Sequence, residues 1–130
     1  MNPRLAIVED NPDNRLLARA LLEELYECTE YETGIAALRG MPRQVPALVL
    51  LDISLPGMDG IETLERLRAI PALRALPVIA LTAHAMAGDR EKFLRAGFDD
   101  CVTKPIVDER ILLGAIERAL RGVSAAHVGG

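Results

Sequence analysis

The chain alternates from end to end between short apolar runs and segments of helical composition. The apolar runs predict five strands, at 4–9, 26–31, 47–52, 77–82 and 100–104. The middle run, ALVLL, is apolar at every position, which indicates a strand covered by helices on both faces. Such alternation is typical of parallel sheets with right-handed crossovers. The sequence therefore predicts an α/β fold, a doubly wound five-stranded parallel sheet with helices on both faces.

Apolar residues also recur every three or four positions in the segments between the predicted strands, as in amphipathic helices. The stripes are Leu17, Leu21 and Leu25 in a helix predicted over 13–25, then Ile61, Leu64 and Leu67, and in the last helix Ile111, Ala115 and Ala119. We expect each of these stripes to face the sheet.

Size and charge limit the classes of function. The chain has 130 residues, half of them apolar, which suits one domain with its own core. We expect this domain to occupy residues 1–122 and residues 123–130, which are small and unpatterned, to form a flexible tail. The net charge of −4 provides no basic surface for nucleic acid, so we expect no nucleic-acid partner.

Neither a membrane span nor a secretory leader is evident, because the apolar runs are short and the N-terminus lacks the pattern of a signal peptide. We therefore expect a cytoplasmic protein without a membrane partner. Cys28 and Cys101 have no CxxC spacing, so we expect reduced thiols and no metal site at either.

Polar residues stand where the predicted strands end. Glu9 and Asp10 close the first strand, Asp52 the third, Thr82 the fourth and Lys104 the fifth. In doubly wound sheets, ligands bind beyond the carboxyl ends of the strands, so these side chains are expected to converge. Each residue alone has a simpler explanation, such as a helix cap for the first two acids, but that explanation does not account for the joint placement.

Clustered acids call for a cation, because carboxylates about 4 Å apart repel by roughly 4 kcal/mol per pair at an effective dielectric constant near 20. Mg²⁺ suits such a site, since it binds a few carboxylates and accepts phosphate oxygens. Asp52 ends the central strand and is the candidate nucleophile for a phosphoryl group. Lys104 and the hydroxyl of Thr82 can supply the positive charge and the positioning that phosphoryl transfer needs.

The motifs EDN, DISLPGMDG, ALTAHAM and TKPI together resemble the receiver domain of bacterial two-component response regulators, the CheY-like superfamily. The resemblance extends to about Arg121 and implies the flavodoxin-like strand order 2-1-3-4-5. The stretch TAHAMAGDREKFLRAGFDDCVTKPI resembles DivK-type single-domain receivers and also the receivers attached to hybrid histidine kinases.

The resemblance assigns roles to the acidic residues. Asp52 matches the phosphoacceptor and, like Asp10, a metal ligand. Glu9 matches an acid that acts on the metal directly or through water. Ser54 matches the residue whose backbone carbonyl completes the metal ligands of the protein.

The resemblance also implies a switch. Thr82 matches the hydroxyl that moves toward the phosphoryl group, and Lys104 the cation that pairs first with Asp52 and then with phosphate. The bond between Lys104 and Pro105 is expected to be cis. Ala83 leaves a path for phosphodonor and water, and His84 is expected to tune the phosphate lifetime by shaping the access of water.

One position departs from the family pattern. Receivers usually carry Tyr or Phe three residues before the lysine, where this chain has Cys101. The usual coupling between the switch hydroxyl and an aromatic ring is therefore in question. Either the output surface switches through backbone shifts of the fourth helix and the preceding loop, or it is read in another way.

The resemblance implies a single-domain response regulator that is a phosphoacceptor rather than an enzyme, although it promotes its own phosphorylation and dephosphorylation. The expected partners are a histidine kinase or histidine phosphotransfer protein and a downstream protein target. We expect a monomer or a weak dimer through the face of the fourth helix, fifth strand and fifth helix. The sequence does not separate a diffusible regulator from a phosphorelay intermediate.

Two other functions fit some of these residues. A magnesium-dependent phosphohydrolase with an aspartyl-phosphate intermediate would generally need an acid two residues after Asp52, where this chain has Ser54. A binding scaffold with the same fold would not need the acids, Thr82 and Lys104. Elsewhere, we expect Asp59 to serve the turn before the third helix, and 99–100 to be a solvated turn.

Overall fold

The computed structural model of the chain describes residues 2–83, 88–104, 106 and 108–129, except for the side chains of 123–129. The strands are β1 (Arg4–Val8), β2 (Glu27–Tyr31), β3 (Leu48–Asp52), β4 (Val78–Thr82) and β5 (Asp100–Thr103). The helices are α1 (Pro12–Leu22), α2 (Gly34–Gly40), α3 (Gly60–Ala69), α4 (Asp89–Ala96) and α5 (Glu109–Gly129). All strand pairs are parallel and the order is β2-β1-β3-β4-β5, which confirms the predicted flavodoxin-like fold.

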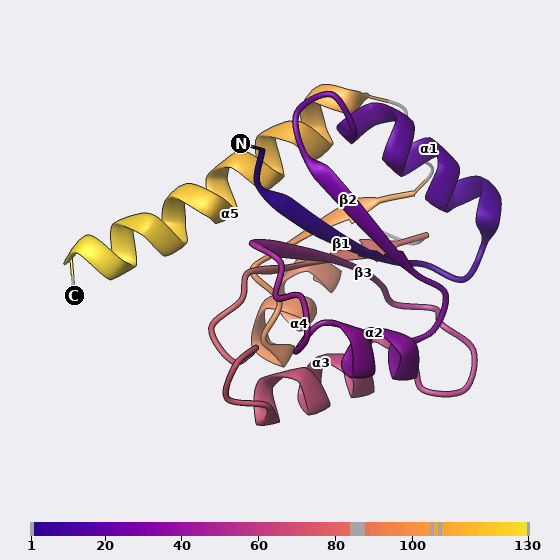
Figure 1. The fold of residues 1–130 in the computed structure, drawn as a ribbon, viewed down its shortest axis with the longest axis horizontal. Helices are drawn as coiled ribbons and strands as arrows, with labels where there is room; N and C mark the ends of the chain where they lie inside the picture. Colours follow the sequence, from indigo (N-terminus) through magenta and orange to yellow (C-terminus); the bar gives the residue numbers. More distant parts are fainter. Residues whose placement is uncertain (1, 84–87, 105, 107, 130) are drawn as a thin grey trace.

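The helices form two layers, one on each face of the sheet. Figure 1 shows α1 and α5 above the sheet and α2, α3 and α4 below it. Strand residues alternate between the two cores. Ile7 and Leu50 pack with α1 and α5, whereas Val8 and Leu51 pack with the other three helices. All five residues of β3 are buried, as its continuous apolar run predicted.

The buried face of α1 differs from the predicted stripe by one position. Ala18 and Leu22 are buried, whereas Leu17 and Leu25 have exposed fractions of 39% and 53%. Leu25 lies beyond the end of α1, so it cannot share a helical stripe with the others. In α5 the predicted stripe is wrong at Ile111, which is exposed, but Ala115 is buried and Ala119 packs partly buried against the same core. The predicted stripe of α3 is confirmed at Leu64 and Leu67, both buried.

Side-chain caps begin the two helices that follow the strands of the acidic residues. The Asn11 side chain accepts hydrogen bonds from the backbone N–H groups of Asp13 and Asn14 and so starts α1. Asp59 accepts from the N–H of Glu62 at 2.9 Å and caps α3, which confirms its predicted role before the third helix. Both caps fix the loops that leave the carboxyl edge of the sheet.

The bounds of α5 reach Gly129, seven residues beyond the position where we expected the domain to end. In Figure 1 this helix continues past the sheet. The flexibility expected for residues 123–130 remains a prediction.

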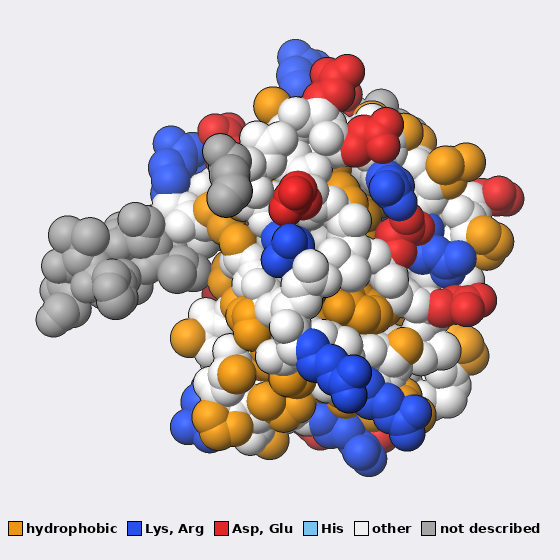
Figure 2. Space-filling model, in the orientation of Figure 1, with side chains coloured by type: hydrophobic (Ala, Val, Ile, Leu, Met, Phe, Trp, Pro, Cys, Tyr) orange, Lys and Arg blue, Asp and Glu red, His pale blue; other side chains and the backbone are white. Residues whose placement is uncertain are grey.

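Charges of both signs occupy the surface. On the face in Figure 2, basic side chains gather over the lower part, while acidic and basic groups alternate above it. Within the described residues, no helix has both the length and the hydropathy that crossing a bilayer requires.

Candidate functional site

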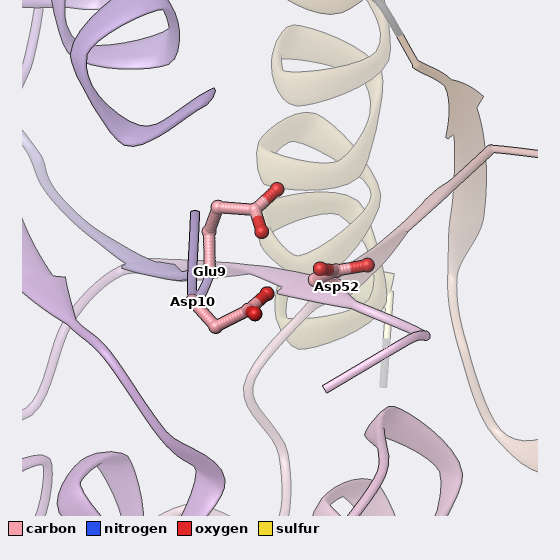
Figure 3. Close-up of side chains that lie close together, drawn as sticks. All are labelled: Glu9, Asp10 and Asp52. Atoms are coloured by element: carbon pink, nitrogen blue, oxygen red, sulfur yellow. The ribbon is translucent and has the colours of Figure 1, made fainter. Parts of the chain in front are cut away.

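Three carboxylates meet at the carboxyl edge of the sheet. Glu9 and Asp10 follow the end of β1, and Asp52 ends the neighbouring strand β3 (Figure 3). One oxygen from each carboxylate lies within 4.8 Å of the others. Glu9 and Asp52 are buried, each with an exposed fraction of 1%, and Asp10 is half-buried. The predicted acidic cluster is therefore formed, and it concentrates negative charge where solvent screens it weakly.

Lys104 places an ammonium group inside this cluster. Its Nζ lies 3.0 Å from Glu9 Oε1 and 3.1 Å from Asp52 Oδ1. Burial lowers the pKa of Lys104, but the hydrogen bonds and charges of the two acids outweigh burial and raise the pKa overall. Lys104 therefore stays protonated between the two carboxylates.

Glu9 shows that one cation does not neutralise the cluster. Burial and a hydrogen bond with Asp52 raise the pKa of Glu9 from 4.5 to about 7, against the opposing effects of Lys104 and the N–H of Asn11. The raised pKa means that the negative charge of Glu9 remains unfavourable in this cluster even with Lys104 in place. A divalent cation at the three carboxylate oxygens would stabilise that charge, so the donor set fits Mg²⁺.

Asp52 is held by backbone as well as by Lys104. Its Oδ1 accepts a hydrogen bond from the N–H of Ser54 at 3.0 Å. Gly60, the first residue of α3, donates its N–H to the carbonyl of Ile53 at 3.0 Å. A Cβ at Gly60 would lie only 2.4 Å from the carbonyl oxygen of Asp52, so glycine allows α3 to begin against the end of β3.

Thr82 and Ala83 lie along the same edge. Thr82 ends β4 and is buried, and its carbonyl accepts a hydrogen bond from the N–H of Lys104 at 2.7 Å. Ala83 follows it and is exposed. His84 and Pro105 lie outside the described residues, so the tuning role of the first and the cis bond before the second remain predictions.

Cys101 occupies the middle of β5 rather than the metal site. Its side chain is half-buried and packs against the core that contains α2, α3 and α4. Burial raises the pKa of this thiol, and Arg90 opposes the effect. Burial also raises the pKa of Cys28 in β2. Both groups are therefore mainly in the thiol form at neutral pH.

We expect both cysteines to react more slowly with iodoacetamide at about pH 7 than the same cysteines in urea-unfolded protein. A raised pKa lowers the fraction of thiolate, which is the nucleophile, and partial burial restricts access. The rate in the folded protein is expected to rise as the pH increases toward 9. Intact mass against time gives both rates, and equal rates at pH 7 in the folded and unfolded protein would contradict the shielding.

Asp100 corrects the prediction of a solvated turn at 99–100. It is the first residue of β5 and has an exposed fraction of only 7%. Its carboxylate pairs with Arg90 of α4 and, at 3.7 Å, with Arg118 of α5. The sequence analysis missed these partners because both are distant in the chain. Asp99 is not simply solvated either, since its carboxylate accepts the N–H of Val78 at 2.8 Å.

A second residue that the sequence analysis missed is Arg15, in the first turns of α1. Its Nη1 donates to the backbone carbonyls of Glu9 at 2.8 Å and Asp10 at 3.1 Å. Its Nε lies 3.4 Å from the carboxylate of Glu30 in β2. The only available signal was the position of a basic residue shortly after the two acids, which does not by itself indicate a contact.

Comparisons with known proteins give the family of this site. Residues 5–117 match the sequence model of one protein family, the response regulator receiver domain. The sensor protein GacS of Pseudomonas syringae pv. syringae is 43% identical over 113 residues, 84% of this chain but only 12% of that protein. The chain thus spans about one eighth of the length of this curated relative.

Solved structures agree on the fold. The receiver domain of a sensor histidine kinase from Pseudomonas aeruginosa, with a magnesium ion coordinated in its active-site cleft, is 37% identical, with a TM-score of 0.83. The alignment covers 92% of this chain and 98% of that one. A Vibrio cholerae chemotaxis protein, 20% identical with a TM-score of 0.84 over 92% of this chain and 99% of that one, shares the fold. From its sequence match, supported by the sheet order and the acidic edge, this chain belongs to the response regulator receiver domain family of two-component signalling.

Proposed function

We propose that Asp52 accepts a phosphoryl group from a phosphohistidine and that Mg²⁺ supports the transfer. The observation that carries the proposal is the position of Lys104 Nζ, 3.1 Å from Asp52 and surrounded by acids that fit a metal ion. Asp10, Asp52 and the backbone carbonyl of Ser54 would hold the metal, with Glu9 acting directly or through water. In this role the chain is a phosphoacceptor that promotes its own phosphorylation and dephosphorylation rather than an enzyme acting on other substrates.

The transfer exchanges one bond for another. An oxygen of the Asp52 carboxylate forms a bond to phosphorus while the bond between phosphorus and the histidine nitrogen breaks, and the imidazole leaves with the electron pair. Bound Mg²⁺ supplies positive charge that offsets the negative charge of the phosphoryl oxygens. Lys104 adjoins the same carboxylate and can pair with the incoming oxygens. The Ser54 N–H orients the acceptor before the reaction.

Phosphorylation then adds up to about two negative charges at the end of β3. We assign Thr82 as the switch hydroxyl, because it ends β4, the strand next to β3. Its backbone carbonyl accepts a hydrogen bond from the N–H of Lys104. Ala83 beside it leaves room for donor and water. Cys101 provides no ring to follow the hydroxyl, so we propose that the signal reaches α4 through the backbone after Thr82.

The partners follow from the same chemistry. Relatives named sensor protein and signal transduction histidine-protein kinase support a histidine kinase or phosphotransfer protein as the phosphoryl source. We propose a cytoplasmic single-domain regulator that binds a downstream protein, as a monomer or a weak dimer through α4, β5 and α5. Arg90, Arg95, Arg110 and Arg118 lie on these helices and are exposed to solvent there.

The test is intact mass after incubation with acetyl phosphate, with and without Mg²⁺. We expect a phosphoryl adduct on the parent protein only with the metal, and none on Asp52→Asn, which keeps the shape of the side chain but not its nucleophilicity. Asp13→Asn, a change at an acid of α1 outside the cluster, is the matched control and should keep the adduct. An adduct that persists on Asp52→Asn would refute the assigned acceptor. Absence of both an adduct and Mg²⁺ binding would favour a scaffold.

A further inference from the structure

A side chain of α1, Arg15, holds the backbone carbonyls of the loop that carries the two N-terminal acids. Arg15 Nη1 donates to the backbone carbonyls of both Glu9 and Asp10, at 2.8 and 3.1 Å. The Arg15 side chain is only 18% exposed, and its Nε lies 3.4 Å from Glu30 Oε1. Arg15 therefore joins the β1–α1 loop, α1 and β2 without touching a carboxylate of the acidic cluster through any of these bonds.

The other contacts of this loop show what Arg15 adds. The N–H of Glu9 donates to the carbonyl of Tyr31 at 3.0 Å, which extends the pairing of β1 with β2 by one residue. The N–H of Asn11 donates to Glu9 Oε2 at 3.2 Å. These bonds fix the N–H groups, whereas Arg15 fixes the carbonyls of the same turn. The carbonyl orientation sets the direction in which the Asp10 side chain leaves the backbone.

We infer that Arg15 is a positioning residue for the cation site: it holds the backbone of Glu9 and Asp10 so that their carboxylates point at Asp52. The inference rests on the proposed function, because it concerns the Mg²⁺ that this function uses. Outer residues that orient metal ligands typically change metal affinity by tenfold or more when they are removed.

The direction in which Mg²⁺ affinity changes when Arg15 is removed distinguishes a positioning role from simple charge repulsion. Arg15 is a positive charge close to a cation site, so charge repulsion alone predicts that its removal strengthens Mg²⁺ binding. Positioning predicts the opposite, because the freed loop must be ordered again when the metal binds. A purely structural role would lower thermal stability without weakening the affinity of the folded protein.

The chain contains a matched control one turn further along α1. Arg19 pairs with the same Glu30, at 2.7 Å, and with Glu23 at 3.6 Å. These contacts go to carboxylates rather than to the backbone carbonyls of the β1–α1 loop. Arg19→Met therefore removes the same charge from the same helix and the same acidic partner.

The experiment is a calorimetric titration of metal-free protein with MgCl₂, for the parent, Arg15→Met and Arg19→Met. We expect Kd to increase about tenfold for Arg15→Met and to stay the same or fall slightly for Arg19→Met. With acetyl phosphate, the Mg²⁺ concentration for half-maximal adduct formation should rise in parallel for Arg15→Met, while the adduct level at saturating Mg²⁺ should match the parent. An affinity equal to or tighter than that of the parent in Arg15→Met would overturn the inference.

One further variant and the behaviour of the parent protein keep the outcome clear. If Arg15→Met does not fold, Arg15→Lys replaces it. This variant keeps the charge but cannot reproduce the guanidinium geometry. A Kd for Mg²⁺ higher than that of the parent therefore supports the inference, and a Kd equal to that of the parent refutes it. If the parent itself fails to bind Mg²⁺, the proposed function fails and the inference with it; if the parent binds and Arg15→Met binds equally well, only the inference fails.

Discussion

Replacing Lys104 by methionine is expected to lower the free energy of unfolding of the metal-free protein by about 3 kcal/mol at neutral pH. Methionine keeps most of the apolar stem but removes the ammonium group that lies between Glu9 and Asp52. Without the cation the buried Asp52 loses its positive partner, and Glu9, whose pKa is already raised to about 7 with Lys104 present, takes up a proton at neutral pH. Urea denaturation with a chelator present measures the loss, and addition of Mg²⁺ should recover part of it.

Two controls bear on this prediction. Lys92 is the only other lysine in the chain and is exposed on α4, so Lys92→Met should change stability by less than about 0.5 kcal/mol. Adding Asp52→Asn to Lys104→Met should restore stability, because the unpaired charge of Asp52 disappears. A loss at Lys104 no larger than at Lys92, or no recovery in the double variant, would show that the cluster does not depend on this cation.

Gly60→Ala is expected to destabilise the protein by about 3 kcal/mol and to impair the phosphoacceptor at the same time. The new Cβ would lie 2.4 Å from the carbonyl oxygen of Asp52 and 2.7 Å from the Cα of Ile53. Both are backbone atoms, so no side-chain rotation can relieve the overlap. Relief requires α3 to move away, which breaks the hydrogen bond from the Gly60 N–H to Ile53, or the end of β3 to shift, which displaces Asp52 from Lys104.

The matched variant is Gly122→Ala in α5, where an added Cβ meets no atom of the described residues within 4 Å. There alanine should be neutral or stabilise the helix by up to about 1 kcal/mol. Thermal unfolding compares the two variants, and acetyl-phosphate labelling reports the acceptor. Parental stability and labelling in Gly60→Ala would mean that the contact between α3 and β3 adjusts at little cost.

The acidic edge could be predicted from the sequence because it depends on two simple regularities. Apolar runs mark strands, and the carboxyl ends of parallel strands meet at one edge. Glu9, Asp10, Asp52, Thr82 and Lys104 all follow from counting where these runs end, and the structure places them at that edge. The order of these residues along the edge follows from the order of the strands. The family resemblance, not the apolar runs, supplied that strand order.

Helix orientation was harder to predict because a leucine-rich helix offers more than one apolar stripe. In α1 the stripe predicted from the sequence was that of Leu17 and Leu21, whereas the buried residues are Ala18 and Leu22. Burial here depends on how α1 packs against the sheet, where Ala18 and Leu22 join the core, and local periodicity does not encode that packing.

The long-range polar contacts could not be predicted at all. Nothing local distinguishes Asp100, which is buried between two arginines, from its neighbour Asp99. Arg15 likewise reads as an ordinary helix residue until its distance to the backbone of Glu9 is known. Such partners depend on the assembled layers, so a single sequence shows the residues but not the pairs.

The ion pairs at the two borders of the sheet also bear on how copies of this protein behave together. β2 and β5 are the edge strands, and each carries paired carboxylates: Glu27 and Glu30 on one, Asp100 on the other. Charged side chains and short length hinder an edge strand from adding a strand of another molecule. These ion pairs thus also discourage sheet extension between copies, which reduces association during folding and at high concentration.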